Sequence, residues 1–147
     1  MTIQQIENEI GKELPESYKN LLSGIEDYCY VDYNEFKKEF PDDSGVSWFF
    51  WSEKRLDEIA VIDGATADRK AWEVLKSYSE IKKSKSAAQG TFLNHVNSLV
   101  SIAEDNGDIL YMDAMDNFSV WIYMHDSGES KRLEDSFDAW IANASIN

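Results

Sequence analysis

The sequence predicts an α+β fold in which an antiparallel or mixed β-sheet is flanked by helices. Asn106-Gly107 separates two apolar runs, and this dipeptide favours a β-hairpin because both residues tolerate the positive φ of a type I′ turn. Residues 118–124 then alternate strictly between two faces, as in a strand. Beyond them, apolar residues at helical spacing predict an amphipathic helix that closes a C-terminal meander, namely Leu133, Phe137, Trp140 and Ile141.

Two helices are predicted at the start of the chain. The first runs to Ile10 with its isoleucines on one face, and Gly11 is placed to end it. Pro15 suits the first turn of the second helix, because a backbone N–H there has no partner within the helix. The apolar face expected for this helix consists of Tyr18, Leu21, Leu22 and Ile25.

The next segments predict strands at 28–33 and 46–51, with one helical turn at 34–40 between them. In the second strand, Trp48 and Phe50 share one face, whereas Phe49 and Trp51 share the other. Aromatic side chains on both faces indicate either a strand covered on both sides or a strand with one face turned to a partner.

The middle of the chain is predicted to be mainly helical. Ser52 suits the N-cap of a helix over 53–60, residues 62–64 form a turn, and a longer helix covers 66–81. Its expected buried residues are Ala71, Trp72, Leu75 and Tyr78. Residues 84–90 are interpreted as a surface loop, residues 92–96 are ambiguous, and residues 99–103 begin the meander.

Length and composition favour one packed domain over residues 1–147. The chain is 43% hydrophobic and 13% aromatic, which is typical of a folded globule rather than a disordered chain. Its net charge of −14 argues against binding to nucleic acid or to anionic membranes, because both need basic surface. The acidic residues concentrate toward the two ends, which indicates either a well-solvated surface or an acidic face for a basic partner.

The single cysteine, Cys29, excludes an intramolecular disulfide and a cysteine-rich metal site. No basic-then-apolar leader opens the sequence, and no apolar run approaches the 18 residues or so of a membrane span. These features predict a protein that stays in the cytoplasm.

Catalytic motifs are not apparent. There is no glycine-rich phosphate loop, nucleophile elbow or His-Glu-x-x-His, and the two histidines, His95 and His125, are far apart in sequence. His125 begins a turn, where a surface or capping role is expected. A small hydrolase built on His125 and nearby acids remains an alternative without a local motif to support it.

The candidate binding residues lie in the meander. Acidic side chains gather near its first hairpin, and two aromatic residues share one face of its third strand: Asp105, Asp108, Asp113, Asp116, Trp121 and Tyr123. The acids are interpreted as turn residues, as an acidic surface for a partner or as a metal or catalytic site, although their spacing does not match a calcium loop. The aromatic pair is interpreted as core or as a partner contact.

Several segments together resemble the SUKH superfamily, which groups bacterial immunity proteins with yeast Smi/Knr cell-wall-assembly regulators. The matching stretches cover about half of the chain in the family's order: residues 6–22 with Leu14-Pro15-Glu16-Ser17-Tyr18, residues 100–108, residues 111–113, residues 120–126 and residues 135–141. The family's usual glycine-rich turn after the second helix is reduced here to Gly24.

The resemblance implies an α+β fold with no cofactor and no enzymatic activity. It further implies an immunity protein that binds and blocks a cognate polymorphic toxin domain, such as a nuclease. The net charge independently suits a basic nuclease as partner. The alternative is a non-enzymatic regulatory module of the same fold with a housekeeping partner.

Overall fold

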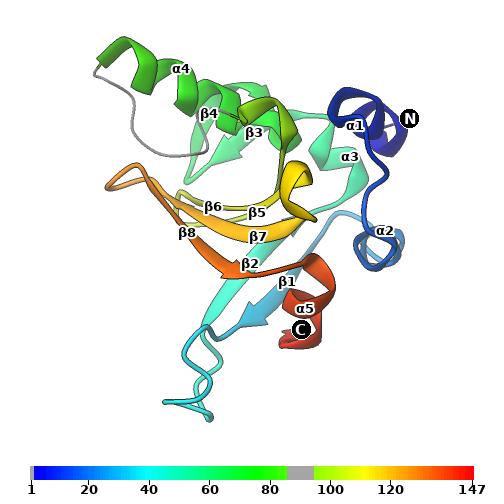
Figure 1. Ribbon diagram of the computed structural model, residues 1–147, viewed down its shortest axis with the longest axis vertical. Helices are drawn as coiled ribbons and strands as arrows, with labels where there is room; N and C mark the ends of the chain where they lie inside the picture. The colour runs from blue at the N-terminus through cyan, green and yellow to red at the C-terminus, as the bar shows by residue number, and fades with distance from the viewer. Residues whose placement is uncertain (1, 86–94) are drawn as a thin grey trace.

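A single large antiparallel sheet forms the centre of the molecule (Figure 1). The computed structural model describes residues 2–85 and 95–147. Within these residues the sheet has seven strands in the order β8-β7-β6-β5-β2-β1-β9. In chain order they are β1 (Tyr28–Tyr33), β2 (Val46–Trp51), β5 (Leu99–Asp105), β6 (Asp108–Asp113), β7 (Ser119–Met124), β8 (Glu129–Glu134) and β9 (Ala144–Ile146). Together with the helices, this confirms the predicted α+β class.

Helices and a second hairpin cover parts of both faces. In Figure 1, α5 (Phe137–Ala142) lies below the sheet. The hairpin of β3 (Ile59–Ile62) and β4 (Ala65–Lys70) lies above the sheet, as does α4 (Leu75–Lys85). The remaining helices gather at one end of the molecule: α1 (Thr2–Ile10), α2 (Glu16–Ser23) and α3 (Glu53–Leu56). Short 3-10 helices complete the connections: η1 (Ala71–Glu73), η3 (Val96–Ser98) and η4 (Ala114–Asp116).

The sheet curls until β8 approaches β1, although four strands separate them in the sheet. The hydroxyl of Tyr33 donates a hydrogen bond to Oε2 of Glu134 across this gap, at 2.6 Å. Lys131 on β8 forms an ion pair with Glu35, which lies two residues after the end of β1. Buried side chains pack on both the concave and the convex face of the curled sheet, and the convex face is left partly open.

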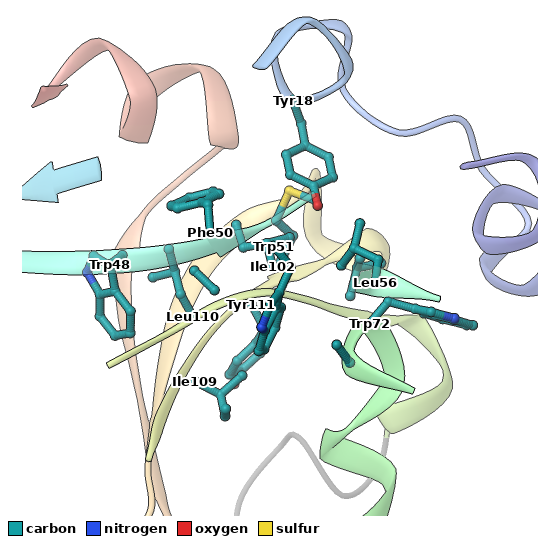
Figure 2. Close-up of a cluster of buried hydrophobic side chains, with 14 of the residues drawn as sticks. Tyr18, Trp48, Phe50, Trp51, Leu56, Trp72, Ile102, Ile109, Leu110 and Tyr111 are labelled. Atoms are coloured by element: carbon teal, nitrogen blue, oxygen red, sulfur yellow. The ribbon is translucent and has the colours of Figure 1, made fainter. Parts of the chain in front are cut away.

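The core is rich in aromatic side chains. Trp140 of α5 lies fully buried on the concave face, with its ring centroid 5.1 Å from that of Tyr33 and 5.6 Å from that of Phe50. Figure 2 shows that buried side chains come from both faces of β2 and from α2, α3 and η1: Trp48, Phe50, Trp51, Tyr18, Leu56 and Trp72. Burial of such large apolar surface is the main stabilising term of the fold.

The middle of the chain differs from its prediction. The helix expected over 53–60 stops at Leu56, and the helix expected over 66–81 is divided into β4, η1 and α4. Strands β3 (Ile59–Ile62) and β4 (Ala65–Lys70) form an antiparallel hairpin. Its turn places Asp63 at φ 51° and Gly64 at φ 80°, the left-handed pair that a type I′ hairpin requires. Asp-Gly therefore acts here as a hairpin signal rather than as a break between helices.

The C-terminal helix is shorter than predicted. Leu133, assigned from its spacing to the helix, lies instead in β8, and α5 begins at Phe137 after the N-cap Ser136. Ser136 Oγ accepts from Ala139 N at 3.1 Å, which fixes this start. The predicted turn at Asn106-Gly107 is confirmed, with φ values of 49° and 98°. The predicted loop 84–90 and the ambiguous segment 92–96 fall largely outside the described residues.

Candidate functional site

The predicted acids Asp105 and Asp108 lie opposite each other at the β5–β6 hairpin. Asp108 is bound by His125, whose Nδ1 lies 2.7 Å from Oδ1 of the carboxylate. This contact raises the pKa of His125, since it stabilises the imidazolium form. Burial and the nearby Asp108 both raise the pKa of Asp105. His125 is therefore a direct partner of Asp108, and Asp105 is a second carboxyl group close to it in the hairpin.

The two acids after the hairpin serve the local structure. Asp113 is buried, and its Oδ1 accepts from Met115 N at 3.0 Å and from Ser98 Oγ at 3.2 Å. Asp116 accepts from Ser119 Oγ at 2.8 Å and forms an ion pair with Arg132. These bonds fix the start of η4 and the approach of β8, which agrees with the interpretation of the acids as turn residues.

The predicted aromatic pair is divided by burial. Tyr123 is 4% exposed, and its ring stacks on Tyr78 of α4 with centroids 5.2 Å apart. Trp121 is only partly buried; its Nε1 donates to Ser119 Oγ at 2.8 Å, and the Arg132 guanidinium lies over its ring. Of the six predicted residues, those with accessible surface are Asp105, Asp108, Asp116 and Trp121, whereas Asp113 and Tyr123 support the surface from within.

An exposed aromatic surface lies on the convex face of β1 and β2, beyond the cover of α4. We call Tyr28, Tyr30 and Phe49 the aromatic cluster. Tyr28 and Tyr30 are 47% and 44% exposed, although tyrosines are more often found half-buried or buried. Tyr30 meets the other two rings edge-on, with centroids 5.9 Å from Tyr28 and 5.7 Å from Phe49. Three contacting rings on rigid strands form a preorganised apolar surface.

Arg55 of α3 fixes this cluster from one side. Its guanidinium lies 5.8 Å from the ring centroid of Tyr28 and 5.6 Å from that of Phe49. The same guanidinium donates to both carboxylate oxygens of Asp27, from Nε at 2.6 Å and from Nη2 at 3.1 Å. Because Asp27 pairs with its charge, Arg55 packs against the rings in a fixed position and is not free to bind a partner's carboxylate.

Beside the aromatic cluster, the β3–β4 hairpin and β2 border a groove of about 290 Å³. Ile59 and Val61 of β3 are 51% and 54% exposed along one wall, and Phe49 lies on the other. Glu104 reaches the groove from β5, where it is the register partner of Phe49. Aromatic cluster and groove therefore share one continuous surface.

Acidic side chains continue this surface toward the hairpin. Asp63 at the β3–β4 turn donates its N–H to Glu104 Oε2 at 3.2 Å. The charges of both Asp63 and Asp108 raise the pKa of His125. We call Asp63, Glu104, Asp105 and Asp108 the acidic rim. Two of its members belong to the predicted site.

Sequence reasoning identified the acidic hairpin but missed the aromatic cluster and the groove. The sequence signal for this surface is the run of aromatic residues at 46–51. One of its two interpretations is a strand with one face turned to a partner. Trp48 and Phe50 form the covered side, and Phe49 belongs to the open one. The place of Glu104 could not be predicted, because it depends on the β3–β4 hairpin, where the sequence predicts two helices joined by a turn.

Within the described ranges, no three His, Cys, Asp or Glu side chains come together in a way that could hold a metal ion. His125 contacts the carboxylates of Asp108 and Asp126, an arrangement that orients a surface imidazole. In the same part of the chain, no helix combines the length and the apolar character needed to cross a membrane.

Comparison with known proteins identifies the family. The model of the SMI1 / KNR4 family (SUKH-1) matches residues 2–143. The comparisons with curated proteins and with solved structures each gave no match. The family match covers both ends of the chain, where the sequence resemblance was noted, and also the middle, where no motif had been assigned. The chain belongs to the SMI1 / KNR4 family (SUKH-1).

Proposed function

We propose that this protein is an immunity protein that binds a cognate bacterial toxin domain and blocks it by occlusion, without catalysis, in the cytoplasm. The observation that carries the proposal is the aromatic cluster, whose two tyrosines are exposed on the sheet face and whose Phe49 pairs with Glu104 of the acidic rim. Buried aromatic anchors with a polar border are typical of tight protein interfaces.

The charge of the chain supports a basic partner. A net charge of −14 attracts a positively charged domain over a distance set by the ionic strength, and so speeds its encounter. A nuclease domain carries basic surface because it must bind phosphate. An acidic, aromatic surface that covers such a domain would exclude its nucleic-acid substrate by simple competition.

Preorganisation supports tight binding. The rings of the aromatic cluster contact one another, and the Arg55–Asp27 pair fixes their edge. Side chains that are already ordered lose little conformational entropy when a partner covers them. The interface therefore has its apolar anchor in place before the complex forms.

The test is co-expression with the proposed cognate toxin domain, sought among the neighbouring genes, combined with binding of the two purified proteins. The wild type is expected to protect the cells and to form a stoichiometric complex. Reversing Asp105 and Asp108 to Lys should weaken binding most strongly at low salt, because the lost attraction is electrostatic. Reversal of Asp138 on α5 removes the same type of charge elsewhere and should have a smaller effect.

A wild-type protein that neither binds nor protects would overturn the proposal. It would then favour the alternative, a regulatory module of the same fold with a housekeeping partner.

A further inference from the structure

The groove beside the aromatic cluster has room for one long side chain. Its volume of about 290 Å³ lies at the lower limit of small-molecule sites, which start near roughly 300 Å³. Phe49, Ile59 and Val61 supply apolar walls, and Glu58 and Glu104 supply carboxylates. A groove with apolar sides and acidic ends suits a ligand that is apolar along its length and cationic at its tip.

Glu104 is the group that gives the groove its selectivity. Burial raises the pKa of Glu104, and the neighbouring charges of Asp63 and Asp105 raise it further. The N–H of Asp63 is its hydrogen-bond donor, at 3.2 Å from Oε2. Among the residues that the structure describes, no lysine or arginine forms an ion pair with this carboxylate.

Among the described residues that line the groove, Arg55 is the one cation, and it is already engaged. Arg55 binds Asp27 through two hydrogen bonds and covers the rings of Tyr28 and Phe49. Lys70, at the end of β4 and paired with Ile59, forms an ion pair with Asp57. A half-desolvated carboxylate is therefore left at the groove without a compensating charge from either base.

We propose that this groove receives one arginine or lysine side chain of the toxin domain, with its charged end at Glu104 and its aliphatic stem between Phe49, Ile59 and Val61; this rests on the proposed function. An arginine fits better than a lysine, because its planar guanidinium is more weakly hydrated and makes paired hydrogen bonds to a carboxylate. The groove then serves as the specificity pocket of the interface, and the aromatic cluster supplies the larger contact area.

The first test uses a probe that needs no toxin. n-Butylguanidinium is titrated into the full-length protein at constant ionic strength, and amide shifts are followed by NMR. Saturable shifts are expected at Phe49, Ile59, Val61 and Glu104, and n-butanol should not reproduce them. Glu104→Gln should weaken probe binding by about fivefold or more.

A matched control distinguishes probe binding in the groove from nonspecific attraction to the negative charge of the protein. Glu129→Gln removes one carboxylate from the exposed edge strand β8 and should leave probe affinity unchanged. Glu104→Gln keeps an oxygen that accepts from Asp63 and relieves the repulsion among acids, so it should fold normally. Shifts scattered over the surface, or equal affinities for the two variants, would refute the inference.

The second test applies the same variants to the toxin domain. Loss of affinity in Glu104→Gln but not in Glu129→Gln supports the groove. If the wild type binds the toxin domain and both variants bind equally, the groove inference fails and the proposed function stands. If the wild type does not bind at all, the proposed function fails, and the butylguanidinium titration still decides whether the groove accepts a basic side chain.

Discussion

Tyr28 stacks on Phe49 across β1 and β2, with ring centroids 4.8 Å apart and ring planes inclined by 16°. The two residues are diagonal neighbours in the sheet, since Tyr28 pairs with Trp51 and Tyr30 pairs with Phe49. The stack lies on the convex face, where Phe49 packs partly against the core and Tyr28 is 47% exposed. Its order on an open surface is the main structural reason to regard this face as a binding surface.

Tyr30→Ala should weaken binding to the toxin domain while changing stability little. Tyr30 is 44% exposed and contacts both other rings of the aromatic cluster, so its loss removes apolar contact area at the centre of the surface. A cost of about 2 kcal/mol is expected for an aromatic anchor of an interface. Calorimetric titration of the two purified proteins measures it.

Phe40→Ala is the control for this experiment, because Phe40 is 63% exposed in the loop between β1 and β2. It removes an exposed aromatic ring outside the cluster and should leave the affinity unchanged. Equal losses in the two variants would show that exposed aromatic area, rather than the cluster, determines binding.

The meander was predictable because its signals are local. Asn106-Gly107 determines the backbone of its own turn, and alternation along 118–124 follows from strand geometry alone. The aromatic density of 46–51 likewise identified β2. Such features need no knowledge of what packs against them.

The β3–β4 hairpin was missed because tertiary contacts outweigh local preference there. Residues 65–70 are mostly polar or alanine, and their composition favours a helix as much as a strand. Pairing with the apolar strand Ile59–Ile62 makes them extended. The burial of Ala71, Trp72 and Leu75 was nevertheless predicted correctly. The 3-10 helix η1 followed by α4 turns these three side chains toward the core, much as one continuous helix would.

Trp140→Ala should destabilise the fold strongly. Trp140 is fully buried and stacks against Tyr33 and Phe137, so truncation leaves a large cavity beneath the sheet. The expected loss is about 3–5 kcal/mol in the free energy of unfolding, measured by urea denaturation. Met115→Ala, at a residue that is 66% exposed, should stay close to the wild type. A small effect at Trp140 would mean that α5 does not close the core.

Two glycines with nearly equal φ angles separate backbone strain from steric clash. Gly64→Ala at φ 80° meets no atom within 4 Å and should cost roughly 1–2 kcal/mol from the left-handed backbone alone. Gly45→Ala at φ 77° places its Cβ 2.2 Å from the carbonyl oxygen of Tyr33. It should cost roughly 1–3 kcal/mol more, because β1 must shift. Equal unfolding free energies would contradict the close approach of the loop to β1.

The pair of His125 and Asp108 should make the β5–β6 hairpin sensitive to pH. Because the folded-state pKa of His125 is raised above its ordinary value of 6.5, the stabilising contribution of the pair is fully present below pH 6.5. It is lost as the pH rises through the raised folded-state pKa. Proton NMR of the imidazole gives this pKa directly.

Asp108→Asn should lower the pKa of His125, since the hydrogen bond to Asp108 is the largest cause of the shift. Asp126→Asn should lower it less, because the charge of Asp126 is a smaller cause. The opposite order of the two variants would show that Asp126, rather than Asp108, holds the imidazolium.

Hydrogen exchange of the complex with the proposed toxin domain tests the central claim most directly. Bound toxin domain should slow amide exchange in 27–32, 47–51 and 59–64, which carry the aromatic cluster and the groove, and should leave α5 unaffected. A complex in which protection is confined to α5, β8 or β9, with no change in β1 and β2, would contradict the account.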